Sequence, residues 1–111
     1  EKIEGIRFLE DIEGVQHNYA YFPILVDYKR FGKTRDATYE ELKRHKIFGR
    51  RYFYPLISQF PTYRGLPSAK PSNLTIAEEV ADHVICLPIY PSMGISIVHR
   101  IYEILIRFTL N

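Results

Sequence analysis

The segment NYAYFPILVD at residues 18–27 combines aromatic and β-branched side chains, which favour an extended strand. Alternation along such a strand directs Ile24 and Val26 to one face and Leu25 to the other. Pro23 lies inside the run and has no backbone N–H to donate. We therefore expect either an edge strand or a strand that lacks a partner on one side at this point.

The residues on both sides of this strand alternate between helical and extended patterns. Residues 2–10 have the apolar spacing of the end of a helix, which Gly14 would break. TYEE at residues 38–41 matches a capping box, with its threonine as N-cap, and predicts a short helix. KIFGRRYFY at residues 46–54 predicts a second strand, in which Gly49 allows a bulge or the close approach of another group.

The second half of the chain predicts a long loop, two helices and a short extended segment. Residues 55–74 contain four prolines and no periodic pattern. A loop of this length is usually functional or disordered, and its aromatic residues favour a packed loop. TIAE at residues 75–78 matches a second capping box and begins a helix. CLPIYP at residues 86–91 is extended, and a last helix is expected at residues 94–109.

This order of elements predicts an α+β fold, with a small antiparallel or mixed sheet of about three strands and helices packed on one face. At 111 residues the chain has the size of one domain, which we assign to residues 1–111. The chain begins without Met and already in helix-like spacing. We therefore interpret it as a piece of a longer protein, with residues 1–14 as the end of a preceding interdomain helix.

Composition argues against several classes of function. The net charge of +2 provides no strong electrostatic basis for binding nucleic acid or an anionic membrane. No signal peptide is visible, and no apolar run approaches the roughly 20 residues of a membrane span. The single cysteine, Cys86, excludes an internal disulfide, and its apolar surroundings predict a buried, inert thiol. The four histidines lack metal-ligand spacing. We expect a soluble cytoplasmic protein without a metal site.

The segment RRYFYP at residues 50–55 places two arginines directly before three aromatic residues. An arginine that points inward from a strand needs an anionic partner, because an unpaired buried charge is very costly. That partner is either a protein carboxylate or an anionic group of a ligand, and the sequence leaves both open. The rings either pack in a core or line a cleft for a planar or sugar-like ligand. A platform for single-stranded nucleic acid is a weaker alternative, because the chain lacks a wider basic face.

No catalytic residue, cofactor ligand or metal ligand is predicted in this chain. The candidate substrate-binding residues are Arg50, Arg51, Tyr52, Phe53 and Tyr54.

Taken in order, these segments resemble the C-terminal small domain of the PLP-dependent sugar aminotransferases, the DegT/StrS-type family of fold-type I enzymes. The landmarks are a strand ending in Val-Asp, a short helix and an Ile-x-x-Arg-x-aromatic-aromatic-Tyr-Pro strand. An FPTY segment, a helix containing A-E-x-V and an LPIYP turn before the last helix follow. The resemblance covers about residues 15–108 and implies the small-domain fold of these enzymes.

The resemblance implies a full-length transaminase that passes an amino group from glutamate to a nucleotide-linked, typically dTDP-linked, keto-deoxyhexose. Such enzymes serve surface-polysaccharide or glycosylated-metabolite biosynthesis. A homodimer is implied, with the Schiff-base lysine and most PLP contacts on a large domain that this chain does not contain. The chain alone would bind no PLP and would be inactive. Its own lysines match no Schiff-base position: Lys2, Lys29, Lys33, Lys43, Lys46 and Lys70.

In such an enzyme RRYFYP would line the small-domain wall of the cleft. Arg50, with Arg51, would meet an anionic group of substrate or cofactor, and the rings would shape the side that faces the hexose. Many relatives have His-Tyr-Pro where this chain has Phe53-Tyr54-Pro55, so any role of that histidine does not transfer to Phe53. The alternative is a stand-alone, non-catalytic binding or dimerisation module with the same fold.

Overall fold

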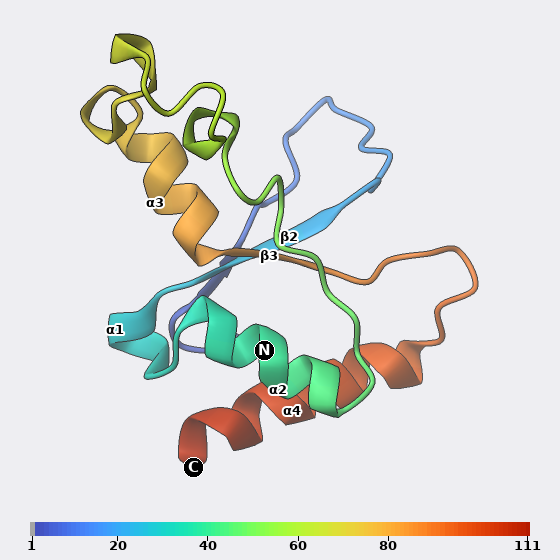
Figure 1. Cartoon of the computed structure of the whole chain (residues 1–111). Helices are drawn as coiled ribbons and strands as arrows, with labels where there is room; N and C mark the ends of the chain where they lie inside the picture. The colour runs from blue at the N-terminus through green and yellow to red at the C-terminus, as the bar shows by residue number, and fades with distance from the viewer. Residues whose placement is uncertain (1) are drawn as a thin grey trace.

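The computed structural model describes residues 2–111, which form a three-stranded antiparallel sheet and four α-helices (Figure 1). The strands are β1 (Ile6–Phe8), β2 (Phe22–Val26) and β3 (Val84–Leu87), in the spatial order β1-β2-β3. The helices are α1 (Tyr28–Phe31), α2 (Arg35–Arg44), α3 (Thr75–His83) and α4 (Ile95–Leu110). The predicted α+β class is confirmed, and the sheet is antiparallel throughout.

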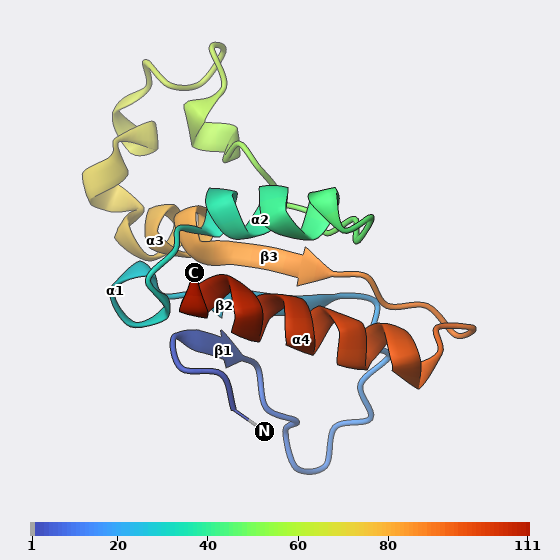
Figure 2. The ribbon, with the colours of Figure 1, turned by 90° about the horizontal axis from the view of Figure 1, so that it is seen from below.

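Helices α2 and α4 cover one face of the sheet, whereas α3 and the loop at residues 55–74 lie on the other side (Figures 1 and 2). The covered face carries Ile24 and Val26 from β2 and Ile85 from β3, all of them buried. They pack in one core cluster with Leu42 of α2 and Ile101 of α4. The alternation predicted for β2 is therefore correct, and the core lies between sheet and helices.

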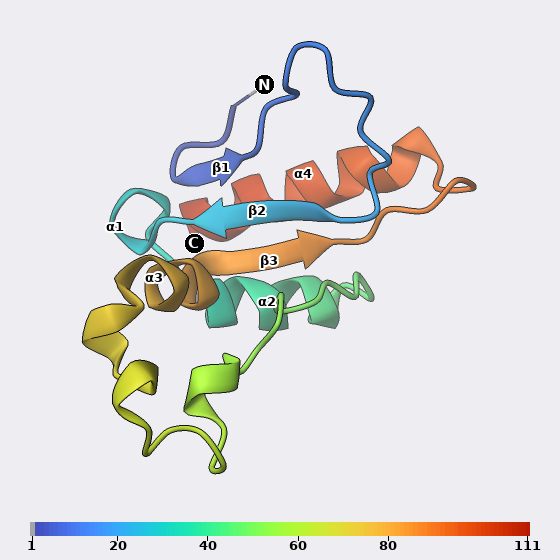
Figure 3. The ribbon, with the colours of Figure 1, turned by 90° about the horizontal axis from the view of Figure 1, so that it is seen from above.

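Strand β2 is the central strand, and Pro23 occupies a position where only one neighbour is paired (Figure 3). Strand β1 ends at Phe8, which pairs with Ile24, one residue short of the proline. The N–H of Asp27 donates to the Gly5 carbonyl on the β1 side, 2.8 Å away. Alternation places the nitrogen of Pro23 on that same side. The position without an N–H donor thus faces the region that β1 does not reach. Of the two predicted alternatives, an edge strand or a strand unpaired on one side at Pro23, the second is found.

Residues 2–14 contain no helix, so the prediction of an interdomain helix is wrong for all of its described residues; Glu1 lies outside them. Gly5 has φ +78°, a left-handed conformation that interrupts a right-handed helix, and β1 follows it directly. Ile3 and Ile6 both pack against the core. A turn followed by a strand has produced the three-residue apolar spacing that suggested a helix.

Both predicted capping boxes are wrong in position, although both helices exist. Helix α2 begins one turn earlier than predicted, because Thr34 is its N-cap and accepts a 3.1 Å hydrogen bond from the Ala37 N–H. Thr38 is fully buried within the helix, and its hydroxyl donates to the Thr34 carbonyl. Helix α3 has Leu74 at its N-cap, without a side-chain cap, and Thr75 is its first residue.

Residues 46–54 form no strand, contrary to the prediction. Left-handed backbone at Lys46 (φ +62°) and Phe53 (φ +46°) interrupts the extended conformation. Only Arg50 pairs with the sheet: its N–H donates to the Cys86 carbonyl at 2.9 Å, and the Cys86 N–H donates back at 2.7 Å. The segment thus touches β3 at one residue instead of extending the sheet.

Gly49 brings this segment close to β3, which is the second of the two predicted alternatives, a bulge or a close approach. A Cβ at this glycine would lie 2.9 Å from Cγ2 of Ile85 and 3.1 Å from the Cys86 carbonyl oxygen. Contacts that short do not occur without displacement of one partner. The absence of a side chain therefore lets the arginine segment approach the sheet.

The loop at residues 55–74 contains three single-turn 3₁₀ helices and is less packed than predicted. The turns are Ile57–Gln59, Pro67–Ala69 and Pro71–Asn73. The rings of Phe60 and Tyr63 are 39% and 44% exposed. The loop projects away from the sheet and from helices α2 and α4 (Figure 3).

The chain exposes more surface than a compact protein of its size. Its accessible area is 8626 Å², whereas a folded monomer of this mass exposes about 6,400 Å². The radius of gyration is 15.7 Å, compared with about 13 Å for a compact domain of this length. Ile76 of α3 and Ile95 of α4 contribute, each at least 70% exposed. The excess of roughly 2,200 Å² is comparable to a large protein–protein interface.

Replacement of Gly5 by Ala should destabilise the protein much more than the same change at Gly14. Both residues have φ +78°, so the backbone cost of about 1–2 kcal/mol is shared. A Cβ at Gly5 would also lie 2.3 Å from the Phe31 nitrogen, whereas nothing lies within 4 Å of the Gly14 position. We expect Gly5→Ala to cost about 3 kcal/mol or more, measured by urea denaturation. Equal losses in the two variants would contradict the close contact.

The position of the α2 cap can be tested by removing two hydroxyls. Thr34→Ala should lower the free energy of unfolding by about 1 kcal/mol, because the Ala37 N–H loses its acceptor. Thr75→Ala should change it by less than about 0.5 kcal/mol, because Thr75 caps nothing. A larger loss in Thr75→Ala would show that Thr75 is the N-cap of α3, as the sequence suggested.

Candidate functional site

The two adjacent arginines of RRYFYP lie in different surroundings. The Arg50 side chain lines a pocket beside β3, whereas the Arg51 side chain contacts α2. Neighbouring residues of an extended backbone point in opposite directions, and the pairing of Arg50 with Cys86 makes the chain extended there. The five candidate residues therefore divide into two groups.

The pocket beside β3 has a volume of about 320 Å³, and Arg50 is one of the residues that line it. Three half-exposed or exposed rings line it, those of Tyr21, Phe48 and Tyr90. Within residues 2–111, no carboxylate lies within 4 Å of the Arg50 guanidinium. One unpaired cation among aromatic rings suits a ligand with an anionic group attached to a planar or sugar moiety.

Cys86 forms part of the same pocket, and its side chain is buried as predicted. Burial raises the pKa of the Cys86 thiol, and the nearby charge of Arg50 offsets this only in part. The neutral thiol therefore prevails near neutral pH. This agrees with a structural role for the cysteine.

Arg51 has a protein partner for its charge. Its guanidinium lies 3.5 Å from Oδ1 of Asp36 on α2 and stacks over two rings, those of Tyr39 (5.0 Å) and Tyr54 (4.8 Å). Of the two partners that the sequence left open, a protein carboxylate is the one found for this arginine. Arg50 is consequently the residue whose charge remains available to a ligand.

Arg35 belongs to the same cluster and was missed in the sequence. Only 4% of it is exposed; Nη1 donates to the carbonyls of Ala81 (2.6 Å) and Val84 (3.2 Å), and Nε donates to Asp36 (2.7 Å). Its guanidinium also lies 5.2 Å from the centre of the Tyr54 ring. With Thr34 recognised as the N-cap, the sequence would have placed Arg35 and Asp36 in the first turn of α2. The predicted capping box at Thr38 left both residues outside the helix.

Tyr52 and Phe53 connect the two groups. The Tyr52 ring meets the Tyr21 ring edge-on at 5.2 Å and the Phe53 ring at 4.2 Å. Phe53 itself is 68% exposed. The segment thus places Tyr52 beside the pocket of Arg50 and turns at Phe53. It then places the Tyr54 ring against Arg35 and Arg51.

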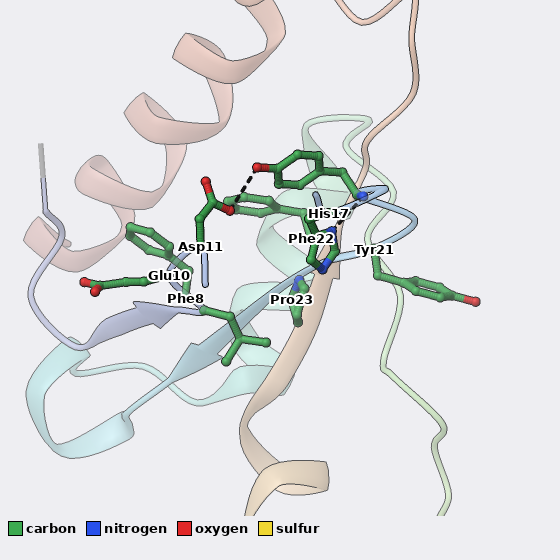
Figure 4. A pocket seen from close by; sticks show the side chains of 9 residues that line it. Phe8, Glu10, Asp11, His17, Tyr21, Phe22 and Pro23 are labelled. Atoms are coloured by element: carbon green, nitrogen blue, oxygen red, sulfur yellow. Dashed lines mark hydrogen bonds between the residues drawn. The ribbon is translucent and has the colours of Figure 1, made fainter. Parts of the chain in front are cut away.

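A second hollow lies at the start of β2 and has a volume of about 420 Å³ (Figure 4). Two of its lining rings, those of Phe8 and Phe22, stack at 6.2 Å. The Tyr19 hydroxyl donates to Asp11 at 2.9 Å, and the Tyr19 N–H donates to Nδ1 of His17 at 2.7 Å. The hydrogen bond and charge of Asp11 raise the pKa of the Tyr19 hydroxyl. These exposed groups satisfy one another and form no recognisable catalytic set.

Metal-binding clusters and membrane-spanning helices are not found in the part of the chain that the structure describes. Over residues 2–111, no group of three His, Cys, Asp or Glu side chains is arranged to hold a metal ion. None of the described helices is both long and apolar enough to cross a bilayer.

Comparison with known proteins places this geometry in a family. The sequence profile of the DegT/DnrJ/EryC1/StrS aminotransferase family matches residues 1–106. A dTDP-4-amino-4,6-dideoxy-D-glucose transaminase from Escherichia coli is 54% identical over 102 residues, which are 92% of this chain and 27% of that protein. A transaminase of the same description from Shigella dysenteriae is 36% identical over 102 residues, covering 84% of this chain and 27% of its own length.

Two solved structures share the fold. DesI, crystallised in the presence of its TDP-sugar product, superposes with a TM-score of 0.78 and 27% identity, over 91% of this chain and 25% of DesI. A protein from Bacillus cereus ATCC 10987 assigned as a PLP-dependent aminotransferase gives a TM-score of 0.61 and 27% identity, over 77% and 22%. The chain spans about a quarter of the length of the curated relatives it matches. It belongs to the DegT/DnrJ/EryC1/StrS aminotransferase family, and the predicted resemblance to a C-terminal domain of these enzymes is confirmed.

Proposed function

We propose that this chain is the C-terminal small domain of a PLP-dependent transaminase that aminates a dTDP-linked keto-deoxyhexose, with glutamate as amino donor. The observation that carries the proposal is the 54% identity, over 92% of the chain, to a dTDP-4-amino-4,6-dideoxy-D-glucose transaminase. The resemblance of the fold to DesI supports the same substrate class. A homodimer in the cytoplasm, serving surface-polysaccharide or glycosylated-metabolite biosynthesis, belongs to the same proposal.

Within that enzyme, the pocket of Arg50 forms part of the sugar-nucleotide site. The guanidinium binds an anionic group of the substrate, because it has no carboxylate partner within the described residues and is exposed. Charge-assisted contacts of this type are stronger than neutral hydrogen bonds. The neighbouring Tyr21 and Tyr90 rings offer faces for the apolar side of a sugar or a base.

The residues of this chain do not fit PLP. PLP enzymes hold the cofactor through a lysine in a desolvated pocket, with an acidic partner for the pyridine nitrogen. None of the six lysines is buried; Lys33 is half-buried over the Phe108 ring, and the others are exposed. We propose that the lysine and the acidic partner lie outside residues 1–111, and that the segment alone is inactive.

Arg50→Ala in the full-length enzyme should raise KM for the sugar nucleotide or lower kcat at least about tenfold, which is about 1.4 kcal/mol. The Arg50 contact with β3 uses backbone atoms, so the variant keeps that pairing. Arg50→Lys should retain part of the activity because it keeps the charge. The matched control is Arg107→Ala on α4, which removes an exposed arginine 3.9 Å from Glu103. Unchanged steady-state kinetics in a folded Arg50→Ala variant would remove Arg50 from the site.

The position of the cofactor can be tested by reductive trapping. Borohydride treatment of the full-length protein with PLP, followed by peptide mapping, should label one lysine outside residues 1–111. The isolated segment mixed with PLP should show no visible absorption band of a specific complex. Stoichiometric labelling of a lysine within the segment would contradict the assignment of PLP to the rest of the enzyme.

A further inference from the structure

The Tyr54 ring contacts two arginines from different parts of the chain. The guanidinium of Arg35 is 5.2 Å from the ring centre, and that of Arg51 is 4.8 Å from it. Both distances are within the range of attractive cation–π contact. Half of the tyrosine remains exposed, so the arginines hold one part of the ring and leave the rest accessible.

Asp36 joins the two arginines. Its Oδ1 accepts a 2.7 Å hydrogen bond from Nε of Arg35 and lies 3.5 Å from Nη1 of Arg51. Two guanidinium groups at one ring repel each other, and a shared carboxylate reduces that repulsion. Without this carboxylate, the more exposed Arg51 is the one free to move away, because Arg35 is held elsewhere.

Arg35 is fixed by the junction of α3 and β3. Its Nη1 donates to the Ala81 carbonyl, in the last turn of α3, and to the Val84 carbonyl at the start of β3. Carbonyl groups at a helix C-terminus carry partial negative charge and stabilise a cation. Arg35 is almost fully buried, whereas 62% of the Asp36 side chain is exposed. Arg35 therefore provides the rigid part of the cluster, and Asp36 extends it to Arg51.

The segment that carries the candidate site has few other fixed points. It pairs with β3 at Arg50 alone and forms no strand, and an irregular loop follows Pro55. Phe53 has φ +46° and turns the chain between Tyr52 and Tyr54. Secondary structure thus does not determine where the rings after Arg50 lie. The contact of Tyr54 with the two arginines is what holds the end of the segment.

We propose that Arg35 and Asp36 are positioning residues. They hold Tyr54, and through it the rings of Tyr52 and Phe53 on the same wall of the site, in the geometry needed to bind the sugar nucleotide. This inference rests on the proposed function, because it concerns the same wall of the site. Neither residue touches the substrate. Their removal weakens binding of the sugar nucleotide and leaves the reaction with the amino donor unaffected.

The test compares Asp36→Asn with Glu40→Gln in the full-length enzyme. Glu40 lies on the same helix and pairs with exposed Lys43 at 3.9 Å, so its amide variant removes a carboxylate without touching Tyr54. We expect Asp36→Asn to raise KM for the sugar nucleotide at least about fivefold, which is about 1 kcal/mol. The conversion of the cofactor by glutamate, followed by absorbance without the sugar, should stay within about twofold. Asp36→Glu, which keeps the carboxylate, should recover most of the affinity.

Hydrogen exchange measures the positioning independently of activity. Peptides covering residues 50–60 should exchange faster in Asp36→Asn and in Arg35→Lys than in the wild type, whereas Glu40→Gln should leave them unchanged. Unchanged exchange in Asp36→Asn and Arg35→Lys would overturn the proposal. An equal loss of rate in the reaction with glutamate and in the reaction with the sugar nucleotide would also overturn it. If the wild-type enzyme aminates no keto-sugar nucleotide, the proposed function fails, and the exchange result alone decides whether Arg35 and Asp36 hold the segment.

Discussion

The pairing of β2 with β3 is the constraint on which the site depends. Ile24 and Ile85 face each other across these strands and are buried beneath α2 and α4, so the register of the two strands is determined by the core. Cys86, the next residue of β3, binds the backbone of Arg50. The core thus positions Arg50 through one pair of backbone hydrogen bonds, although residues 50–54 form no strand.

Around that fixed point the segment is shaped by side chains and not by secondary structure. Tyr52 rests on Tyr21, the residue before β2, and Tyr54 rests on Arg35 of α2 and on Arg51 of the segment itself. Such contacts are individually weak, so the segment can adjust where a strand could not. The exposed apolar area on α3, α4 and the loop at residues 55–74 indicates that further contacts come from outside the described chain.

The sequence was sufficient where one physical rule acts alone. The alternation along β2 was predicted directly and is found, and the unpaired side of Pro23 and the close approach at Gly49 are each one of two predicted alternatives. It was insufficient where two local patterns compete. Thr34 and Thr38 are both plausible caps one turn apart, and only the packing of the buried Thr38 distinguishes them.

The same limit applies to the site. The five candidate residues were recognised by type, but their division into two groups depends on tertiary contacts. Arg51 and Asp36 lie fifteen positions apart, and the carbonyl partners of Arg35 lie more than forty positions away in the sequence. No local pattern reports such distant neighbours. The helix predicted from the apolar spacing of Ile3 and Ile6 was wrong because the same spacing arises from a turn followed by a strand. Gly5, between the two isoleucines, adopts a left-handed conformation that interrupts a helix.

The opposite directions of Arg50 and Arg51 have a consequence for how this enzyme class can vary. The connection between α2 and the arginine pair, residues 45–49, sets which guanidinium turns toward the pocket and which toward Asp36. Insertion of one residue between Gly49 and Arg50 would turn Arg50 toward Asp36 and Arg51 toward the pocket side, while Gly49 keeps its place against β3. The length of this connection therefore determines which arginine lines the pocket, independently of the identity of the residues that follow it.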